Sequence, residues 1–358
     1  MKGSNYNKMI ALLIIAVFAV PMTAAVSSHG SSGDNTFVSY YDQLDANGKA
    51  IYDQVNSATP DETVIDVTLP VILTAQADNP DDAKEYVVDL AKATINNAFA
   101  ALTLSSPLAF WTWEVSVVPM PDIEPMITGN TATLSTIHFT NNLSYLPTDP
   151  ATGEPQSIQK MLDDINAAID KFSTSSDTVR GKVLDINNYL VNLITYDPNW
   201  GGDNASKFGH DVYGAFVDPN HYAVCDGYSK AFLILCEKEG INSVVVKGTA
   251  LPSLVSHAWN YVQMENGNWY AIDVTWNDDG SGSNPYFLVG GSTFFTTHQQ
   301  GVFLDTGLLA YNLNSPVVSA TPYDNETAPN YDIYSWLLAA IVVIAIAVAL
   351  IRYARRGG

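Results

Sequence analysis

Residues 155–305 of this 358-residue chain are predicted to form an α+β fold, on two observations. Apolar residues recur at helical spacing in three segments: 156–172, 177–194 and a helix that begins at Cys225. Three segments with alternating apolar residues follow, at 243–247, 256–264 and 268–276. Helices grouped ahead of an antiparallel sheet are typical of the α+β class.

Residues 26–150 are predicted to form a separate N-terminal α/β extension. Its expected elements are short helices within 37–55 with a break at Asn47-Gly48, a strand over 64–73, a helix over 81–104, and two or three strands within 108–147. Trp111, Trp113 and Tyr145 stand in the last of these segments. Aromatic residues at a spacing of two pack in a core or, alternatively, form a binding platform.

The first 25 residues have the pattern of a secretory signal peptide. Lys2 and Lys8 precede the apolar run from Met9 to Val20, and Thr23-Ala24-Ala25 supplies the small residues that a signal peptidase accepts. An uncleaved membrane anchor is the alternative interpretation. On both interpretations the chain is directed to the membrane.

A transmembrane helix is predicted at 333–351, because these 19 residues carry no charge and would form a helix about 28 Å long, close to the thickness of a bilayer core. Arg352, Arg355 and Arg356 follow, so the positive-inside rule places the tail, 352–358, in the cytoplasm. A buried helix of a soluble protein is the alternative. Residues 306–332 are expected to form a stalk, which predicts a single-pass protein of the cell membrane with its catalytic domain outside.

The charge of the chain excludes one class of partner. Its formal net charge is −21, from 37 acidic and 16 basic residues, and five of those basic residues lie in the two predicted membrane-directed ends. Such a surface repels phosphate backbones, so we expect no nucleic-acid partner.

The two cysteines, Cys225 and Cys236, are predicted to be unpaired, although an exported chain favours disulfides. They lie on one predicted helix and are separated by about 16 Å along its axis. A disulfide needs Cα atoms within about 7 Å of each other. We therefore expect Cys225 to be a reactive free thiol and Cys236 to be inert core packing.

Cys225, His257 and Asp273 form the strongest candidate site. Cys225 begins a helix, whose unpaired N–H groups and dipole favour a thiolate. His257 begins a strand, and Asp273 lies between two apolar residues of the next strand, where a carboxylate without a partner would be costly. A thiol, an imidazole and a carboxylate in this order are the parts of a nucleophile, its base and the group that orients the base.

The residues around these three positions resemble the transglutaminase-like superfamily, in the prokaryotic exported branch that includes cysteine peptidases and cross-linking enzymes. The likeness is carried by Cys225-Asp-Gly-Tyr-Ser-Lys-Ala-Phe232, Glu239-Gly-Ile241, His257-Ala-Trp-Asn260 and Asp273-Val-Thr-Trp276, with Tyr213-Gly-Ala-Phe216 upstream. It covers roughly residues 155 to 300. The resemblance implies a papain-like transglutaminase core with Cys225 as nucleophile, His257 as base and Asp273 as orienting carboxylate.

Three functions stay open on these residues. The preferred one is a cell-surface cysteine peptidase or amidase, which acts on peptides or proteins of the cell envelope and in which water resolves the thioester. The second is a protein cross-linking transglutaminase, in which a lysine amine does so. The third is a non-catalytic surface binding or adhesion module that uses the N-terminal region, and the intact triad argues against it.

The remaining groups of the site are less well marked. The backbone N–H of Cys225 is expected to be one donor to the oxyanion, and Tyr213 is predicted as the second, with Trp200 as the alternative. No cofactor is expected. No catalytic metal is expected either, because the other histidines, among them His298, show no HxxxH or HExxH spacing.

The loop between the last two strands predicts how His257 meets Asp273. A three-residue loop with Gly267 in the left-handed conformation pairs Met264 with Asn268, and this register places His257 and Asp273 on one face as diagonal neighbours. A two- or four-residue loop would place them on opposite faces. We therefore predict positive φ at Gly267 and a hydrogen bond between the carboxylate and the imidazole.

Overall fold

The computed structural model describes residues 37–59, 62, 64–112, 120–140, 156–301 and 313–324. The signal peptide, the transmembrane helix with its cytoplasmic tail, Trp113 and Tyr145 lie outside these residues, so the corresponding interpretations stay predictions. Within the described part of the chain, no helix is both long and apolar enough to cross a membrane.

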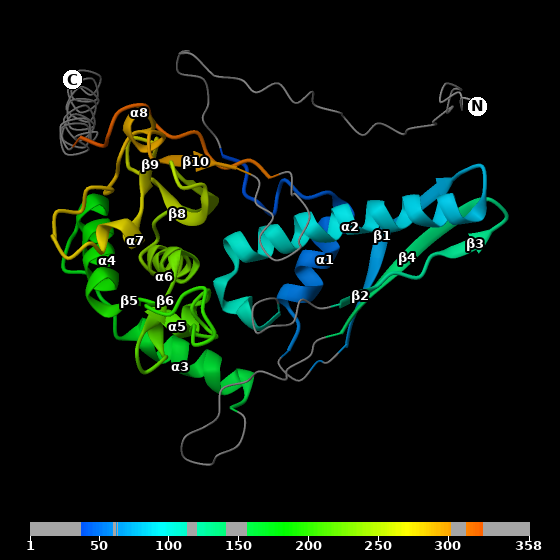
Figure 1. Cartoon of the computed structure of the whole chain (residues 1–358), viewed down its shortest axis with the longest axis horizontal. Helices are drawn as coiled ribbons and strands as arrows, with labels where there is room; N and C mark the ends of the chain where they lie inside the picture. The colour runs from blue at the N-terminus through cyan, green and yellow to red at the C-terminus, as the bar shows by residue number, and fades with distance from the viewer. Residues whose placement is uncertain are drawn as a thin grey trace, which may run out of the picture. The chain divides into compact units, whose positions relative to one another are not determined.

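The N-terminal region is an antiparallel sheet with two helices packed on it (Figure 1). Its elements are β1 (Val64–Gln76), β2 (Met120–Asp122), β3 (Met126–Thr128), β4 (Thr131–Thr140), α1 (Ala46–Asn56) and α2 (Pro80–Ser105). β4 pairs with the other three strands. Alternate residues of β1 and one face of α2 are buried in a shared apolar cluster, so this region has its own core.

Two expectations for the N-terminal region are wrong. Asn47-Gly48 does not break a helix, because Asp45 caps α1 and accepts a hydrogen bond from Gly48 N at 2.7 Å. The Asn47 amide instead bonds both backbone groups of Val71, at 2.8 and 2.9 Å. Trp111 lies in a 3-10 helix, η1 (Pro107–Thr112), and not in a strand.

The second region has the predicted order of helices followed by an antiparallel sheet. The helices are α3 (Ile158–Asp170), α4 (Val179–Leu193), α5 (Val212–Phe216) and α6 (Cys225–Lys238). The sheet has the order β10 (His298–Gln300), β7 (Ser243–Ala250), β8 (Val255–Gln263), β9 (Trp269–Ile272). Two short strands, β5 (Thr195–Tyr196) and β6 (Tyr222–Ala223), pair in parallel just before α6. The α+β class is therefore confirmed, and β10 is an addition to the predicted sheet.

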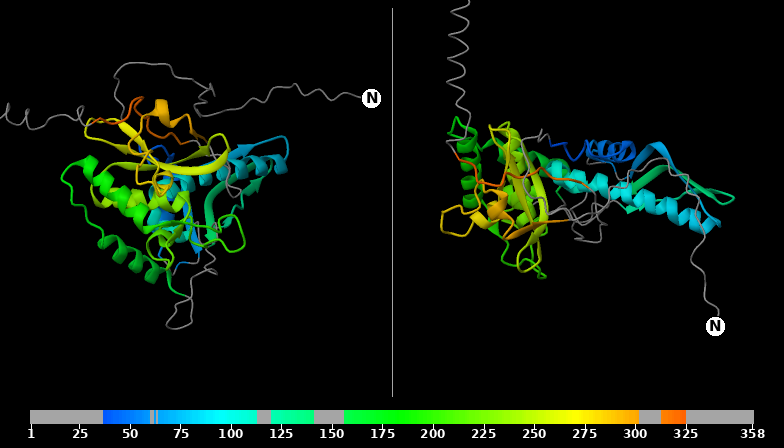
Figure 2. Two further views of the ribbon diagram at one scale, coloured as in Figure 1. Left: turned by 60° about the vertical axis from the view of Figure 1, so that its left-hand side comes forward. Right: turned by 90° about the horizontal axis from the view of Figure 1, so that it is seen from above.

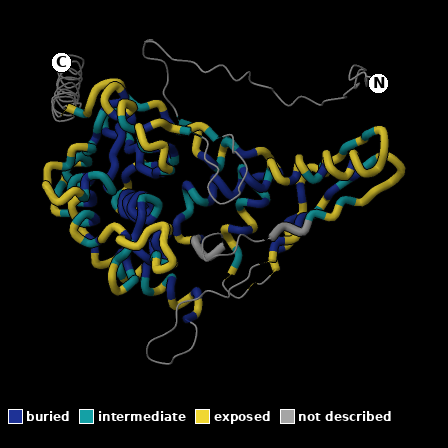
Figure 3. Tube along the Cα trace, in the orientation of Figure 1, coloured by how far each residue is buried: buried dark blue, intermediate teal, exposed yellow. Residues whose placement is uncertain are grey.

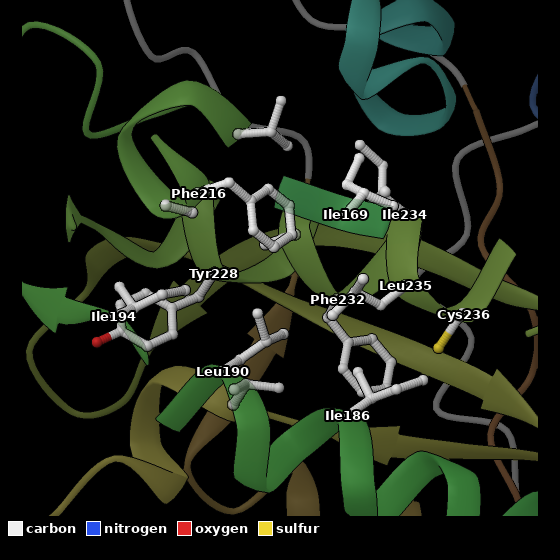
Figure 4. Packing of buried hydrophobic residues seen from close by; sticks show 14 of the residues in the cluster. Ile169, Ile186, Leu190, Ile194, Phe216, Tyr228, Phe232, Ile234, Leu235 and Cys236 are labelled. Atoms are coloured by element: carbon white, nitrogen blue, oxygen red, sulfur yellow. The ribbon is translucent and has the colours of Figure 1, made fainter. Parts of the chain in front are cut away.

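Helix α6 lies at the centre of this region, with β8 against one side and α4 and α5 against others (Figures 1 and 2). Its residues from Gly227 to Cys236 are all buried, as the dark tube at this helix in Figure 3 shows. Ile186 and Leu190 of α4 point toward Phe232 of α6 in Figure 4. Each such side chain contributes about 1.5–3 kcal/mol when fully buried, so the start of α6 is fixed by a well-packed helix.

Part of the predicted stalk packs against the sheet. Ser319 N donates to Trp269 O at 2.8 Å, and Tyr323 N donates to Leu288 O at 3.0 Å. The expectation that all of 306–332 is a free stalk is therefore wrong for residues 313–324. β9 is the last strand of its sheet, and an edge strand carries unpaired backbone groups that a non-periodic, proline-containing segment can still satisfy.

Candidate active site

Cys225 is the first residue of α6. The helix begins after Val224, whose backbone is extended and whose side chain does not cap the helix. The first N–H groups of the helix therefore have no capping side chain, and they form the positive end of the helix dipole. Cys225 is partly exposed and Cys236 is buried, and both are free thiols, as predicted. Burial raises the pKa of the Cys236 thiol well above its ordinary value, so Cys236 is poorly suited to react.

Gly227 brings the start of α6 close to the preceding loop. A Cβ atom at Gly227 would lie 2.7 Å from the backbone oxygen of Gly209, and Val224 N donates to that same oxygen at 2.8 Å. The absent side chain therefore lets the chain's own backbone approach the helix start. The structure thus gives Gly227 a packing role.

His257 and Asp273 meet as the predicted register requires. Gly267 has φ +79°, Gly267 N donates to Met264 O at 2.8 Å, and Met264 N donates to Asn268 O at 3.0 Å. The Nε2 atom of His257 lies 2.7 Å from Oδ2 of Asp273, and both side chains are almost fully buried. The predicted turn and the predicted hydrogen bond are confirmed.

Asp273 itself is not a strand residue. β9 ends at Ile272, and Asp273 is the N-cap of a short helix, α7 (Val274–Asn277). Its Oδ1 atom accepts a hydrogen bond from Trp276 N at 3.1 Å. Aspartate is among the best N-cap residues, and this local preference ends the strand earlier than the apolar pattern predicts. The cap also directs the second oxygen, Oδ2, toward His257.

The electrostatics favour a charged imidazole. Burial by itself lowers the pKa of His257, but the charge and hydrogen bond of Asp273, together with the hydrogen bond and charge of Cys225, raise that pKa to about 10. Burial raises the pKa of Asp273, and the charge and hydrogen bond of His257 with those of His298 lower it below its ordinary value. Since Asp273 occupies Nε2, the ring nitrogen left for the thiol is Nδ1.

His298 belongs to this site and was not predicted. Its Nε2 atom lies 3.1 Å from Oδ2 of Asp273, and its side chain is fully buried. The histidine lies in β10, 25 residues after Asp273, within a polar run of threonines and glutamines. No spacing in that run indicates a buried position, because the contact depends on how β10 pairs with β7.

Tyr213 and Trp200, the two predicted side-chain donors to the oxyanion, have no described contact with the triad residues. The Tyr213 hydroxyl donates to Gln156 at 3.2 Å and its ring packs on Phe208 within the apolar core. Trp200 is 49% exposed and lies in the turn after β5. The structure therefore gives Tyr213 a packing role, and it brings neither residue into a described contact with Cys225.

Tyr196, which was not singled out from the sequence, lies near the thiol. Burial and then the charge of Cys225 raise the pKa of Tyr196 to about 12. Its strand, β5, pairs with β6 two residues ahead of Cys225. Tyr196 is 41% exposed and remains protonated at neutral pH, which makes its neutral hydroxyl a candidate donor to the oxyanion.

Asp226 forms an ion-pair cluster beside the nucleophile. Its carboxylate lies 3.1 Å from Lys247 Nζ and 3.0 Å from His210 Nδ1. Burial raises the pKa of Asp226, but the charges of Lys247, Lys230 and His210 and the hydrogen bond of His210 hold it well below its usual range. Asp226 is therefore ion-paired beside the start of α6.

His257, Asp273 and His298 are also a possible metal-ligand set, since their donor atoms lie within 4.8 Å of one another. The hydrogen bonds of 2.7 and 3.1 Å already join Oδ2 of Asp273 directly to both ring nitrogens. A metal would have to separate these atoms within a fully enclosed space. The group fits a proton-linked network better than a metal site.

The triad lies within the part of the chain that matches a known family. Residues 166–274, which contain the triad, match the model of the transglutaminase-like superfamily. A search of curated proteins finds no match to the chain. Among solved structures, the chain is similar to a TGase, with 22% identity over 45% of each chain and a TM-score of 0.27. It is also similar to a candidate cysteine protease from Cytophaga hutchinsonii, with 16% identity and a TM-score of 0.24. The alignment covers 44% of this chain and 63% of that one.

The chain covers less than two thirds of the length of either solved protein. At these TM-scores and identities, neither likeness carries information about function. The family match is independent of them and includes all three triad residues. Residues 166–274 are therefore similar to the transglutaminase-like superfamily, over a stretch that holds Cys225, His257 and Asp273.

Proposed function

We propose that this protein is a cysteine hydrolase of peptide or amide bonds at the cell surface, anchored by a single C-terminal membrane helix. The observation that carries the proposal is the hydrogen bond of 2.7 Å between His257 and Asp273, and Cys225 at the start of α6 is among the groups that raise the pKa of this imidazole. This arrangement supplies a nucleophile, a base and an orienting carboxylate in one place.

The chemistry follows from these positions. The Cys225 thiolate attacks the carbonyl carbon of the substrate and forms a tetrahedral oxyanion, for which N–H groups at the start of α6 and the Tyr196 hydroxyl are the proposed donors. His257 gives its proton to the leaving amine as the C–N bond breaks, and a thioester remains. Water then attacks the thioester while His257 takes up the proton, which releases a carboxylic acid and restores the thiolate.

Water is the preferred acceptor because the thiol edge of the site is open. Cys225 is partly exposed and Tyr196 beside it is 41% exposed. A transferase has to keep water away from the thioester for long enough to let an amine attack. An open edge favours hydrolysis on this ground.

The location at the cell surface rests on the sequence. A signal-like segment at 1–25, an uncharged segment at 333–351 and the three arginines after it support an outward-facing catalytic domain. The acidic net charge of −21 is compatible with peptide or protein substrates and disfavours polyanions.

Product analysis in labelled water tests the proposal. The full-length protein in detergent is incubated with a mixture of envelope peptides in H2(18)O, with and without an added primary amine, and the Cys225→Ala variant is the control. We expect new carboxyl termini that carry the heavy oxygen, that need Cys225 and that persist when amine is added. Amine-capped products in place of carboxylates would show a transferase, and identical products from Cys225→Ala would refute a cysteine enzyme.

A further inference from the structure

We propose that His298 is a fourth, positioning residue of the site, which holds the Asp273 carboxylate so that it can orient His257. The inference rests on the proposed function of Cys225 and His257. It goes beyond the triad, and His298 lies outside the residues, 166–274, that the family model matches.

The Asp273 carboxylate is held by three N–H groups. His257 and His298 both reach Oδ2, at 2.7 and 3.1 Å, and Trp276 N reaches Oδ1 at 3.1 Å. The carboxylate has no exposed surface, and its ion pairs within the described residues are those with the two histidines. A buried anion depends on such donors, so His298 provides about one third of its hydrogen bonding.

Of the two described partners of Oδ2, His298 is the one that does not take part in the proposed proton transfers. His257 gains and loses a proton at each step, and the strength of its bond to the carboxylate changes with its charge. His298 makes its contact from β10, a different strand from the one that carries His257. A carboxylate held from two sides keeps its orientation when one of the two partners changes charge.

The position of the His298 ring is itself fixed on several sides. The ring stacks on Phe294 with centroids 3.9 Å apart and an angle of 13°, and Trp276 lies 4.4 Å away. Its Nδ1 atom lies 2.9 Å from the Thr297 hydroxyl. An ionised carboxylate only accepts hydrogen bonds, so Nε2 carries the proton toward Asp273.

The surroundings of His298 contain few groups that titrate. Asp273 and His257 face the His298 ring from the β8–β9 side. The ring centroid of Tyr286 lies 5.4 Å from that of His298. The other ring contacts are with Trp259, Trp276 and Phe294. The buried imidazole is therefore explained by its bond to Asp273, because burying a polar group without a partner is unfavourable.

The test is a double-mutant cycle on the reactivity of Cys225 in the full-length protein. His298→Leu removes the donor, and His298→Gln keeps an N–H that can reach Asp273. Each is made alone and together with Asp273→Asn. The measured quantity is the second-order rate of Cys225 alkylation by iodoacetamide across about pH 5 to 9, where a thiol without a base reacts slowly at the acid end. Thermal unfolding confirms that each variant is folded.

We expect His298→Leu to slow alkylation near pH 6 by about tenfold, the usual effect of losing a hydrogen bond to a charged group. His298→Gln should stay within about threefold of the parent. In the Asp273→Asn background, His298→Leu should have no further effect on the rate, because His298 acts through that carboxylate. If the leucine variant does not fold, His298→Phe removes the same donor and keeps the ring stack.

Two results would overturn the inference. Equal slowing by His298→Leu with and without Asp273→Asn would show a general packing role, and unchanged alkylation in His298→Leu would show no role. Failure of the proposed function gives a different result, since Cys225 of the parent protein would then react like an ordinary thiol at every pH, whatever stands at position 298.

Discussion

Asp273 is the residue on which the site converges, and it has two different tasks at its two oxygens. Oδ1 caps α7 through Trp276 N, and Oδ2 receives His257 and His298. One carboxylate thereby ends a strand, starts a helix and sets the orientation of the base. Replacing it changes local structure and chemistry together, so the neighbours of Asp273 are better targets for separating the two.

At this scale the first prediction concerns the charge of His257. Its pKa is raised from 6.5 to about 10, so we expect an NMR titration of the ring to show a charged imidazole at neutral pH. Cys225→Ala removes a hydrogen bond and a negative charge from the ring and should lower this pKa. An ordinary titration near 6.5 in the parent protein would contradict the ion pair.

The same shift links the stability of the folded state to pH. Because the folded state holds the His257 proton more tightly than the unfolded state, the stabilising contribution is complete below about pH 6.5 and is lost as the pH rises through about 10. The lowered pKa of Asp273 acts at the other end, where its contribution is lost as the pH falls below the usual range of a carboxyl group.

The second prediction concerns the oxyanion. Tyr196→Phe should lower kcat by about 10- to 100-fold, because a lost donor to the oxyanion affects mainly the transition state. Tyr213→Phe is the matched control: its hydroxyl donates to Gln156, so it should change stability and leave kcat nearly intact. The test is to measure kcat of both variants on any peptide that the protein cleaves. A larger loss of kcat in Tyr213→Phe than in Tyr196→Phe would show that Tyr213 is the oxyanion donor, as the sequence predicts.

Among the elements, the β8–β9 hairpin sets the site because its loop decides which face Asp273 occupies. Gly267→Ala should lower the free energy of unfolding by about 1 kcal/mol, since alanine is strained at the φ of +79° found there. Gly267→Asn should cost less, because asparagine tolerates this conformation. Urea unfolding measures both, and equal stability of the glycine and alanine proteins would argue against the turn.

Local patterns explain which elements could be predicted from the sequence. Helices α3, α4 and α6 and strands β7 to β9 follow apolar periodicity, and the register of the hairpin follows from the single residue Gly267. The end of β9 at Ile272 was missed because the capping preference of Asp273 competes with an apolar run that continues past it. The break at Asn47-Gly48 was wrong for a similar reason, as Asp45 caps the helix there.

Contacts between distant elements explain what could not be predicted. His298 reaches Asp273 through the pairing of β10 with β7, and the pairing of β5 with β6 brings Tyr196 beside Ala223, two residues before Cys225. Neither of these short strands has a periodic pattern. The same holds for residues 313–324, which a composition rich in proline assigned to a stalk and which hydrogen bonds hold against β9.

At the scale of the whole molecule, the N-terminal region contributes to the core beneath the catalytic sheet. Tyr40 donates from its hydroxyl to Val245 O of β7 at 2.9 Å, and Gln43 bonds both backbone groups of Asn314. Tyr40, Ala101 and Leu104 share an apolar cluster with residues of β7, β8 and β9. The two predicted regions, 26–150 and 155–305, therefore each have an apolar core, and they also contact each other.

The membrane anchor gives a prediction at the same scale. Deleting residues 331–358 should move the protein from the membrane fraction to the soluble fraction, because the uncharged segment at 333–351 is removed. Since the described contacts of the 313–324 segment are kept, the truncated protein should unfold at the same temperature as the parent. Fractionation and thermal unfolding check this, and a truncated protein that stays with the membrane after signal cleavage would show the assignment to be incomplete.

The alkylation of Cys225 tests the central claim most directly, because it needs no substrate. The full-length protein is treated with iodoacetamide near pH 6, and the rates at Cys225 and Cys236 are followed by peptide mass spectrometry for the parent and for His257→Ala. We expect Cys225 to react at least about tenfold faster than a free thiol at this pH, Cys236 to stay unmodified, and His257→Ala to abolish the difference. A Cys225 that reacts like a free thiol, with no dependence on His257, would contradict the account.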